Sequence, residues 1–233
     1  LDVGTAYSNG ELPGIADANN VRDAALPGNL PATKALAEAE RFYSEHGTHC
    51  AYWVMNPSST VEQTQPLIEH LIEQGYRRQL DEIFYLRKAA LRNVPIVADV
   101  KVIPARASYR HVEILARERA EGRQVEQCVD ACLRHLDDPH YDALIALAGD
   151  RPVASLGVMA VGELAEIQEV YVSPEMRRRG IGRMMMNRGL EICARSIFKH
   201  VFLVTRKEQE AMQGLCGEFG FSKVGAFESF RRE

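Results

Sequence analysis

Residues 171–186 read YVSPEMRRRGIGRMMM, and this stretch decides the fold of the chain. Upstream of it, residues 166–172 alternate in polarity and are rich in residues that favour β-structure. This pattern predicts a strand that ends at Pro174. Downstream, small and apolar residues recur at helical spacing from residue 185 to residue 196, which predicts a helix. The whole stretch therefore indicates a strand, a basic glycine-containing loop and a helix.

The loop has the chemistry of a phosphate-binding site. Gly180 and Gly182 let the backbone turn and come close to a ligand. The N-terminus of a helix carries free N–H groups and a partial positive charge, both of which favour phosphate. Arg177, Arg178 and Arg179 add formal positive charge. We expect the loop to bind a polyphosphate; the alternative is a solvated basic turn in which a glycine caps the helix.

The loop differs from two familiar nucleotide-binding motifs, since it fits neither G-x-x-x-x-G-K-[ST] nor G-x-G-x-x-G. Arg177-x-x-Gly180-x-Gly182, placed after a strand that ends in V-x-P, instead resembles the acyl-CoA pyrophosphate loop of the GNAT acetyltransferase superfamily. The pattern of that loop is [RQ]-x-x-G-x-[GA]. The resemblance implies an N-acetyltransferase that moves an acetyl group from acetyl-CoA directly to an amine of a small molecule or peptide. A non-catalytic module that binds or senses acyl-CoA is the alternative.

The resemblance also implies which residues hold the cofactor. A splayed strand commonly pairs with the pantetheine arm through its backbone, and the loop neutralises the pyrophosphate. Gln209 stands where the family commonly has an asparagine that touches the cofactor. The implied cofactor-binding residues are Val170, Tyr171, Val172, Arg177, Arg178, Arg179, Gly180, Ile181, Gly182, Arg183 and Gln209. A bulky β-branched side chain at either glycine is expected to abolish cofactor binding.

Three residues are candidates for the catalytic proton transfers. Glu166 matches the strand glutamate that serves as general base in several members of the superfamily. Glu169 is the second candidate; the two-residue period of a strand puts it on the opposite face from Glu166, although a bulge would disturb that parity. Cys216 occupies the position of the tyrosine in the family motif L-Y-E-K-L-G-F, and a thiol could protonate the leaving thiolate. A small packing residue is the equal alternative for Cys216.

The order of predicted elements from about residue 95 to the end is β, α, α, β, β, β, α, β, α, β. The first is a β-rich run at residues 96–102, an apolar strand is predicted at residues 141–148, and the helix after the basic loop is predicted over roughly residues 181–195. This is the element order of the GNAT fold, so we expect an α/β (α+β) protein with a mixed, mostly antiparallel sheet flanked by helices. Residues 93–233 would form the catalytic GNAT domain. The turn that separates the first two predicted helices is placed at Glu121-Gly122.

Residues 1–92 are expected to form a second domain. Residues 1–30 are rich in Gly, Asn, Asp and Pro and show little periodicity. After them comes a predicted helix, strand, helix, Gly-aromatic pair and strand, which is the order of residues 183–230. We interpret this part as a truncated, degenerate copy of the GNAT fold that has lost the phosphate loop; the alternative is an unrelated α+β extension. The second helix is predicted over residues 61–74, and Pro66 within it is tolerable only if the main helix starts near that residue.

Composition narrows the remaining possibilities. The chain has 233 residues and a formal net charge of -4, which argues against a general nucleic-acid binder. The start of the chain is neither basic nor followed by an apolar run, so no signal peptide is expected, and no apolar run is long enough to span a membrane. Five cysteines without a C-x-x-C pair favour a reducing, cytoplasmic setting. No metal site is expected, and the protein would be a monomer or homodimer.

Overall fold

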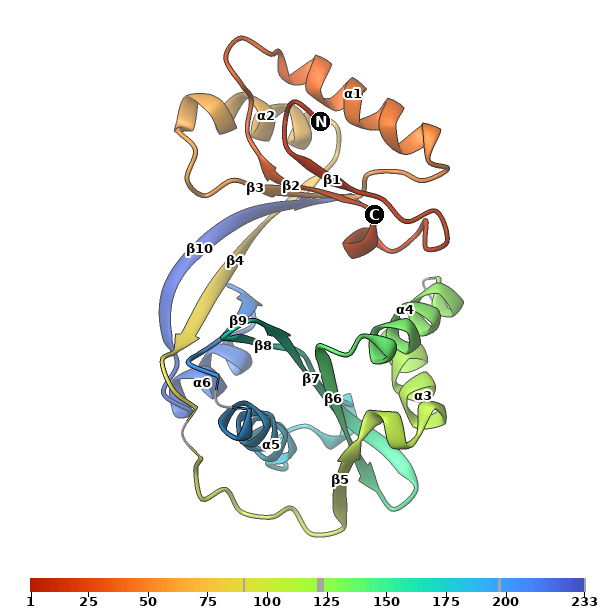
Figure 1. Cartoon of the computed structure of the whole chain (residues 1–233), viewed down its shortest axis with the longest axis vertical. Helices are drawn as coiled ribbons and strands as arrows, with labels where there is room; N and C mark the ends of the chain where they lie inside the picture. Colours follow the sequence, from red (N-terminus) through yellow and green to blue (C-terminus); the bar gives the residue numbers. More distant parts are fainter. Residues whose placement is uncertain (90, 121–123, 197, 233) are drawn as a thin grey trace. The chain divides into compact units, whose positions relative to one another are not determined.

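The computed structural model describes residues 1–89, 91–120, 124–196 and 198–232, and it forms two compact units (Figure 1). The first unit comprises Leu1–Glu82 and the chain from Gly225 onward, and the second comprises Ile83–Val224. Strands β4 (Arg77–Leu86) and β10 (Ser222–Arg231) each contribute residues to both units. The sequence places a single boundary at residues 92/93, whereas the last strand of the structure returns to the first unit, where it pairs with β3.

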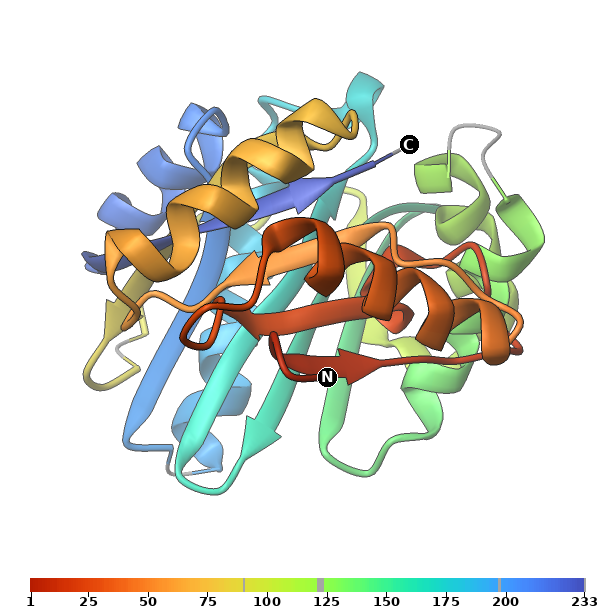
Figure 2. The ribbon, with the colours of Figure 1, turned by 90° about the horizontal axis from the view of Figure 1, so that it is seen from above.

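The first unit is a small sheet with two helices on one face. Its strand order is β1-β2-β3-β10-β4, and α1 and α2 lie side by side over it (Figure 2). Trp53, Tyr43, Leu67 and Phe230 are fully buried in the core between the helices and the sheet. The remaining elements of this unit are β1 (Thr5–Tyr7), a 3-10 turn (Ala16–Ala18), β2 (Asn20–Ala24), α1 (Ala32–Glu45), β3 (Tyr52–Met55) and α2 (Val61–Glu73).

Two features of this unit differ from the sequence prediction. The first 30 residues contain β1 and β2, which the absence of periodicity did not predict because each strand is very short. Helix α2 starts at Val61, as its pattern predicts, but Pro66 lies inside a continuous helix, so the expectation that the main helix starts near Pro66 was wrong. A reciprocal cap at Thr60 and Gln63, in which the Thr60 backbone N–H donates to Gln63 Oε1 at 3.0 Å, fixes the earlier start.

The second unit is a larger sheet with helices on both faces. Its strand order is β4-β9-β8-β7-β6-β5, to which β4 contributes residues 83–86. Helices α5 and α6 pack on one face in the largest core, and α3 and α4 pack on the other face in a smaller core (Figure 1). Its further elements are β5 (Val100–Pro104), a 3-10 turn (Ala105–Ala107), α3 (Tyr109–Ala120), α4 (Val125–Asp137), β6 (Tyr141–Ala148), β7 (Arg151–Val161), β8 (Leu164–Val172), a 3-10 turn (Pro174–Met176), α5 (Ile181–Arg195), β9 (His200–Arg206) and α6 (Glu210–Glu218).

The predicted element order and the mixed, mostly antiparallel sheet are confirmed. The structure gives β6 and α5 the bounds that their patterns predict. Strand β5 starts at Val100 rather than Ile96, because Asp99 takes a positive φ of 63° that an extended strand does not allow. The predicted turn at Glu121-Gly122 lies outside the described residues. Within the described ranges, no helix is long and apolar enough to cross a membrane.

Candidate functional site

Strand β8 carries a bulge in its second half. Gly157 of β7 pairs with Gln168, and Ser155 pairs with Tyr171, so two steps along β7 match three steps along β8. Glu169 lies in the extra step with a positive φ of 52°, a left-handed conformation that is uncommon for residues other than glycine. The bulge therefore changes which face each later side chain of β8 occupies.

Because of the bulge, Glu166 and Glu169 lie on the same face of the sheet, and the prediction from the two-residue period was wrong on this point. Ile167 packs in the core under α5, as does Val170, so the residues between them belong to the opposite face. Glu169 bonds Tyr141, which packs in the smaller core with α3 and α4. A regular strand would have turned Glu169 into the core under α5.

Strands β8 and β9 separate from each other just before the bulge. They pair in parallel at Leu164 with His200, Ala165 with Val201, and Glu166 with Phe202. Over the residues that the structure describes, no further pair joins the two strands, although β8 continues to Val172 and β9 to Arg206. The edge of β8 that faces β9 is therefore open over residues 170–172, and Glu166 lies at the point where the two strands diverge.

The basic loop follows the open edge of β8. Arg178 and Gly180 both have positive φ, 65° and 84°, which turn the chain into the first residue of α5 at Ile181. Arg177 Nε donates to the carbonyl oxygen of Val172 at 3.1 Å and so ties the loop to the strand end. The N–H of Met184 donates to Gly180 O at 3.0 Å, so the N–H groups of residues 181–183 precede the helical ladder and are available to an anion.

The two loop glycines are not equivalent. A Cβ at Gly180 would lie 3.6 Å from Val97 Cγ2, so space is available and only the positive φ requires glycine. A Cβ at Gly182 would be 3.9 Å from Leu215 Cδ2 and from Val172 Cγ2, and the backbone of Gly182 is helical. Arg183, one residue later, is engaged by Glu218, whose carboxylate oxygens accept from Nε at 2.6 and 2.7 Å.

The carboxylate of Glu166 has a partner on its own strand. Gln168 Nε2 donates to Glu166 Oε2 at 2.7 Å, and both residues are half-buried. This hydrogen bond fixes the orientation of the carboxylate where β8 and β9 diverge. Gln168 is not among the residues predicted from sequence, although its two-residue spacing from Glu166 on a strand places both side chains on one face.

The carboxylate of Glu169 is held by residues from α3 and β6. Tyr141 Oη donates to Glu169 Oε2 at 2.8 Å, and Arg119 Nη1 lies 3.7 Å from the same oxygen. Tyr171 is held in a similar way, since its hydroxyl donates to Glu118 Oε1 at 2.8 Å. Burial and the neighbouring Glu118 raise the pKa of Tyr171 to about 12. Sequence alone gives no signal for these pairs, because their members are 28 to 53 residues apart.

The two remaining predicted residues lie at α6. Cys216 is fully buried in the core under the sheet, and burial raises the pKa of its thiol to about 12. This burial fits the alternative that Cys216 is a small packing residue. To donate a proton, the thiol would have to leave the core. Gln209 is exposed at the start of α6, where its Oε1 accepts a hydrogen bond from Thr205 Oγ1 at 2.8 Å.

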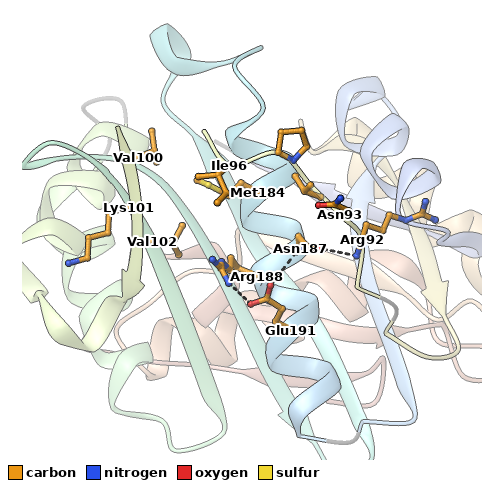
Figure 3. A pocket seen from close by; sticks show the side chains of 12 residues that line it. Arg92, Asn93, Ile96, Val100, Lys101, Val102, Met184, Asn187, Arg188 and Glu191 are labelled. Atoms are coloured by element: carbon orange, nitrogen blue, oxygen red, sulfur yellow. Dashed lines mark hydrogen bonds and ion pairs between the residues drawn. The ribbon is translucent and has the colours of Figure 1, made fainter. Parts of the chain in front are cut away.

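A separate cavity of about 540 Å³ lies beside α5, between that helix and residues 92–102 (Figure 3). Asn187 and Glu191 of α5 form its polar floor: Asn187 Oδ1 accepts from the Arg92 N–H at 3.0 Å, and Arg188 Nη1 lies 2.7 Å from Glu191 Oε2. None of the predicted site residues lines this cavity. It is therefore distinct from the open edge of β8 and from the basic loop.

Taken residue by residue, the structure brings Glu166, the open edge at Val170–Val172 and the loop at Arg177–Arg183 into one continuous path along β8. The open strand edge offers backbone groups to an extended arm, and the helix N-terminus with its exposed arginines suits a diphosphate. Such a path suits an extended ligand that carries a diphosphate at the end near the loop. Cys216 is not part of this path.

Comparison with known families and structures agrees with this geometry. Residues 108–221 match the model of the Acetyltransferase (GNAT) family. A search of the curated proteins finds no match.

Solved structures share the fold at low sequence identity. A functionally unknown conserved protein from Staphylococcus epidermidis is 15% identical, with a TM-score of 0.78 over 100% of this chain and 92% of its own. A tandem GNAT protein from the clavulanic acid biosynthesis pathway is 14% identical, with a TM-score of 0.59 over 92% of this chain and 75% of its own. A GCN5-related N-acetyltransferase from Sphaerobacter thermophilus is 16% identical, with a TM-score of 0.59 over 86% of this chain and 67% of its own.

Proposed function

We propose that the chain transfers the acetyl group of acetyl-CoA directly to the amine of a small molecule or peptide, because residues 108–221 match the GNAT acetyltransferase family. Acyl transfer from acetyl-CoA is the activity of the family, and the amine acceptor is our proposal. The observation that carries it is the position of Glu166, a carboxylate at the divergence of β8 and β9, at one end of the path that begins at the basic loop.

Each part of the path has a role that its chemistry supports. The N–H groups of residues 181–183 and the arginines of the loop hold the pyrophosphate. The edge of β8 at Val170–Val172 orients the pantetheine arm by backbone hydrogen bonds, apart from the Val172 carbonyl, which already accepts from Arg177. Acetyl-CoA, when bound, supplies the activated thioester. Glu166, whose carboxylate is held by the hydrogen bond from Gln168, accepts the proton that the amine must lose as it attacks the carbonyl carbon.

The leaving thiolate needs little help. A thiol of pKa about 8.5 gives a thiolate that leaves readily near neutral pH, so an acid adds little driving force. This explains how the reaction could proceed although Cys216 stands where the family commonly has a tyrosine and its thiol is buried.

Thiol release from acetyl-CoA in the presence of a panel of amines tests the proposal. Glu166→Gln is expected to lower kcat by on the order of 10²-fold, the loss typical of a general base, with nearly unchanged CoA affinity. Glu163→Gln is the matched control: this carboxylate is exposed, pairs with Lys199 and should leave kcat unchanged. Equal kcat values for Glu166→Gln and the parent would show that Glu166 is structural, and acetyl-CoA binding without transfer to any amine would favour a sensing module.

For the first unit we propose the degenerate half-copy. Its succession of α1, β3, α2 and β4 repeats the order of α5, β9, α6 and β10, which supports a shared origin. In this view it binds no cofactor. Photo-crosslinking with a CoA analogue should label peptides from residues 83–224 and none from residues 1–82; a labelled N-terminal peptide would contradict the proposal.

We also propose a cytoplasmic setting and a monomeric or homodimeric state. All five cysteines are free thiols, which agrees with a reducing compartment. Light scattering of the purified chain would determine the oligomeric state, and a mass above that of a dimer would contradict it.

A further inference from the structure

We propose that Tyr141 is a positioning residue that shapes the acetyl-CoA path by holding Glu169 in the left-handed conformation of the β8 bulge. The proposal rests on the cofactor path described above, and it gives Glu169 the role of an anchor for the bulge rather than that of a catalytic base. Neither residue needs to touch the reacting atoms.

The bulge carries an unfavourable conformation that something must offset. Glu169 has a Cβ and a positive φ of 52°, which residues other than glycine and asparagine rarely adopt. Tyr141 Oη donates to its carboxylate at 2.8 Å, and Ser155 Oγ donates to its backbone carbonyl at 3.3 Å. A charge-assisted hydrogen bond of this kind is of the same order as the conformational cost.

Tyr141 is itself fixed from several sides. Its ring is buried and stacks on His135, with ring centroids 3.7 Å apart and planes at 5°. Gly157 of β7 faces the ring, and a Cβ at that position would overlap the Tyr141 side chain. The glycine therefore provides the space that the ring occupies, and the hydroxyl group is directed at β8.

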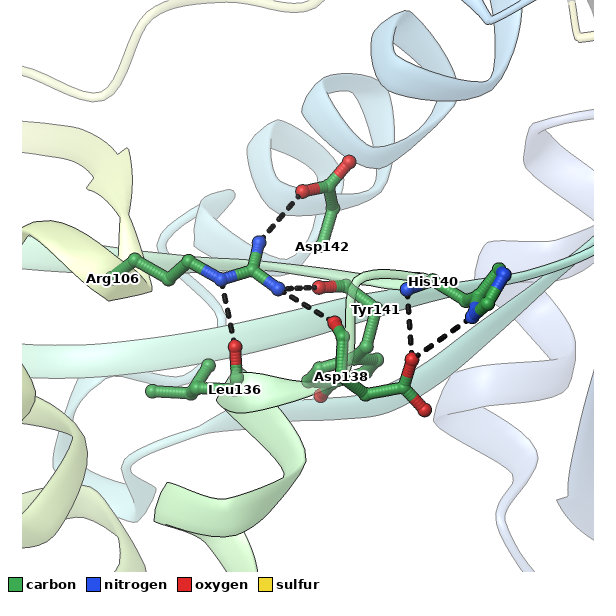
Figure 4. Close-up of polar contacts among 6 residues, drawn as sticks. All are labelled: Arg106, Leu136, Asp138, His140, Tyr141 and Asp142. Atoms are coloured by element: carbon green, nitrogen blue, oxygen red, sulfur yellow. Dashed lines mark hydrogen bonds and ion pairs between the residues drawn. The ribbon is translucent and has the colours of Figure 1, made fainter.

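Arg106 holds the backbone at the start of β6 (Figure 4). Its Nε donates to Leu136 O at 2.7 Å, and its Nη2 donates to Asp138 O and Tyr141 O at 2.7 Å each. These bonds join the end of α4 to the first residue of β6. The backbone from which the Tyr141 side chain reaches Glu169 is therefore held in place by hydrogen bonds.

The bulge determines what the cofactor meets. Without the extra residue, the side chains at 170–172 would exchange faces, because the side-chain period of a strand is two. Val170 and Val172 now pack in the core under α5, and Tyr171 packs on the other side. The open edge of β8 begins at this point, so loss of the bulge would change the edge that receives the pantetheine arm.

The sharpest test compares Glu169→Ala with Glu169→Gly, which differ by a single Cβ. Both lose the carboxylate, but only alanine retains the cost of a positive φ. We expect Glu169→Ala and Tyr141→Phe to weaken CoA binding about tenfold by calorimetry, which corresponds to about 1.4 kcal/mol. Glu169→Gly should bind within about threefold of the parent, and it should restore binding when combined with Tyr141→Phe, because glycine needs no clamp.

Three results would overturn the proposal: parent-like CoA affinity for Tyr141→Phe, equal affinities for Glu169→Ala and Glu169→Gly, or no rescue in the double variant. A failure to rescue would mean that the hydroxyl acts on packing alone. These outcomes are separable from failure of the proposed function, since the readout is CoA binding. If the parent chain does not bind CoA, the cofactor path itself is wrong.

Discussion

The two loop glycines allow the same chemical change to be made two residues apart with different expected results. Gly180 has a φ of 84°, whereas Gly182 is helical, and both have room for a Cβ. An alanine at 180 therefore meets a conformational cost without a clash, and an alanine at 182 meets neither. The comparison isolates the backbone conformation of the loop from its steric fit.

The expected magnitudes follow from this difference. The left-handed conformation costs an L-residue about 1–2 kcal/mol, and the free loop of Gly180→Ala should relieve this cost by rotating its amides away from the phosphate. Binding must then restore the strained conformation, so CoA affinity should fall about tenfold or more. Replacing a helical glycine by alanine stabilises by roughly 0.5–1 kcal/mol, so Gly182→Ala should gain stability and bind CoA within about threefold of the parent.

Urea unfolding and titration calorimetry measure both quantities on the same samples. Gly182→Val extends the series, because its branched side chain should block the approach of the phosphate even though the fold accepts a Cβ. Equal CoA affinities for Gly180→Ala and Gly182→Ala would refute the reasoning. So would parent-like CoA affinity for Gly182→Val.

Three further predictions concern the scaffold. Cys216→Ser should cost about 1–3 kcal/mol of stability, because a hydroxyl would be buried without a partner. It should lower kcat by no more than about tenfold. Loss of all turnover in a variant that folds and binds CoA would point instead to an acyl-cysteine intermediate. Burial raises the pKa of the Cys50, Cys193 and Cys216 thiols from their usual 9 to about 12, so between these pH values only the unfolded chain ionises. The free energy of unfolding should therefore fall as pH rises from about 9 toward 12. A free energy of unfolding that stays constant over this range would contradict the burial of the thiols. Arg106→Lys should cost about 1–2 kcal/mol in urea unfolding, because a lysine cannot reproduce the forked contacts, and an unchanged midpoint would show that these bonds contribute nothing.

The basic loop and the strand and helix on either side of it could be predicted from sequence because their signals are local. Pro174 ends a strand, Gly180 starts a helix, and the spacing of α5 continues without interruption to residue 195. In β6 a continuous apolar run gives the strand its bounds. Such signals depend on neighbours within a few residues, so tertiary packing did not have to be known.

The bulge could not be located from sequence, because a glutamate gives no sign that it will take a positive φ. Its anchor, Tyr141, is 28 residues away and reaches it only once β6, β7 and β8 are aligned. The short strands β1 and β2 were missed for a related reason: β2 is fixed by parallel pairing with β3, some 30 residues later. The burial of Cys216 likewise depends on how α6 packs on the sheet.

A crystal structure of the chain with acetyl-CoA tests the central claim most directly. The account predicts a pyrophosphate on the N–H groups of residues 181–183, a pantetheine arm along the edge of β8 at Val170–Val172, and a thioester directed toward Glu166 where β8 and β9 diverge. A cofactor bound elsewhere, such as in the cavity between α5 and residues 92–102, or a thioester that lies far from Glu166, would contradict it.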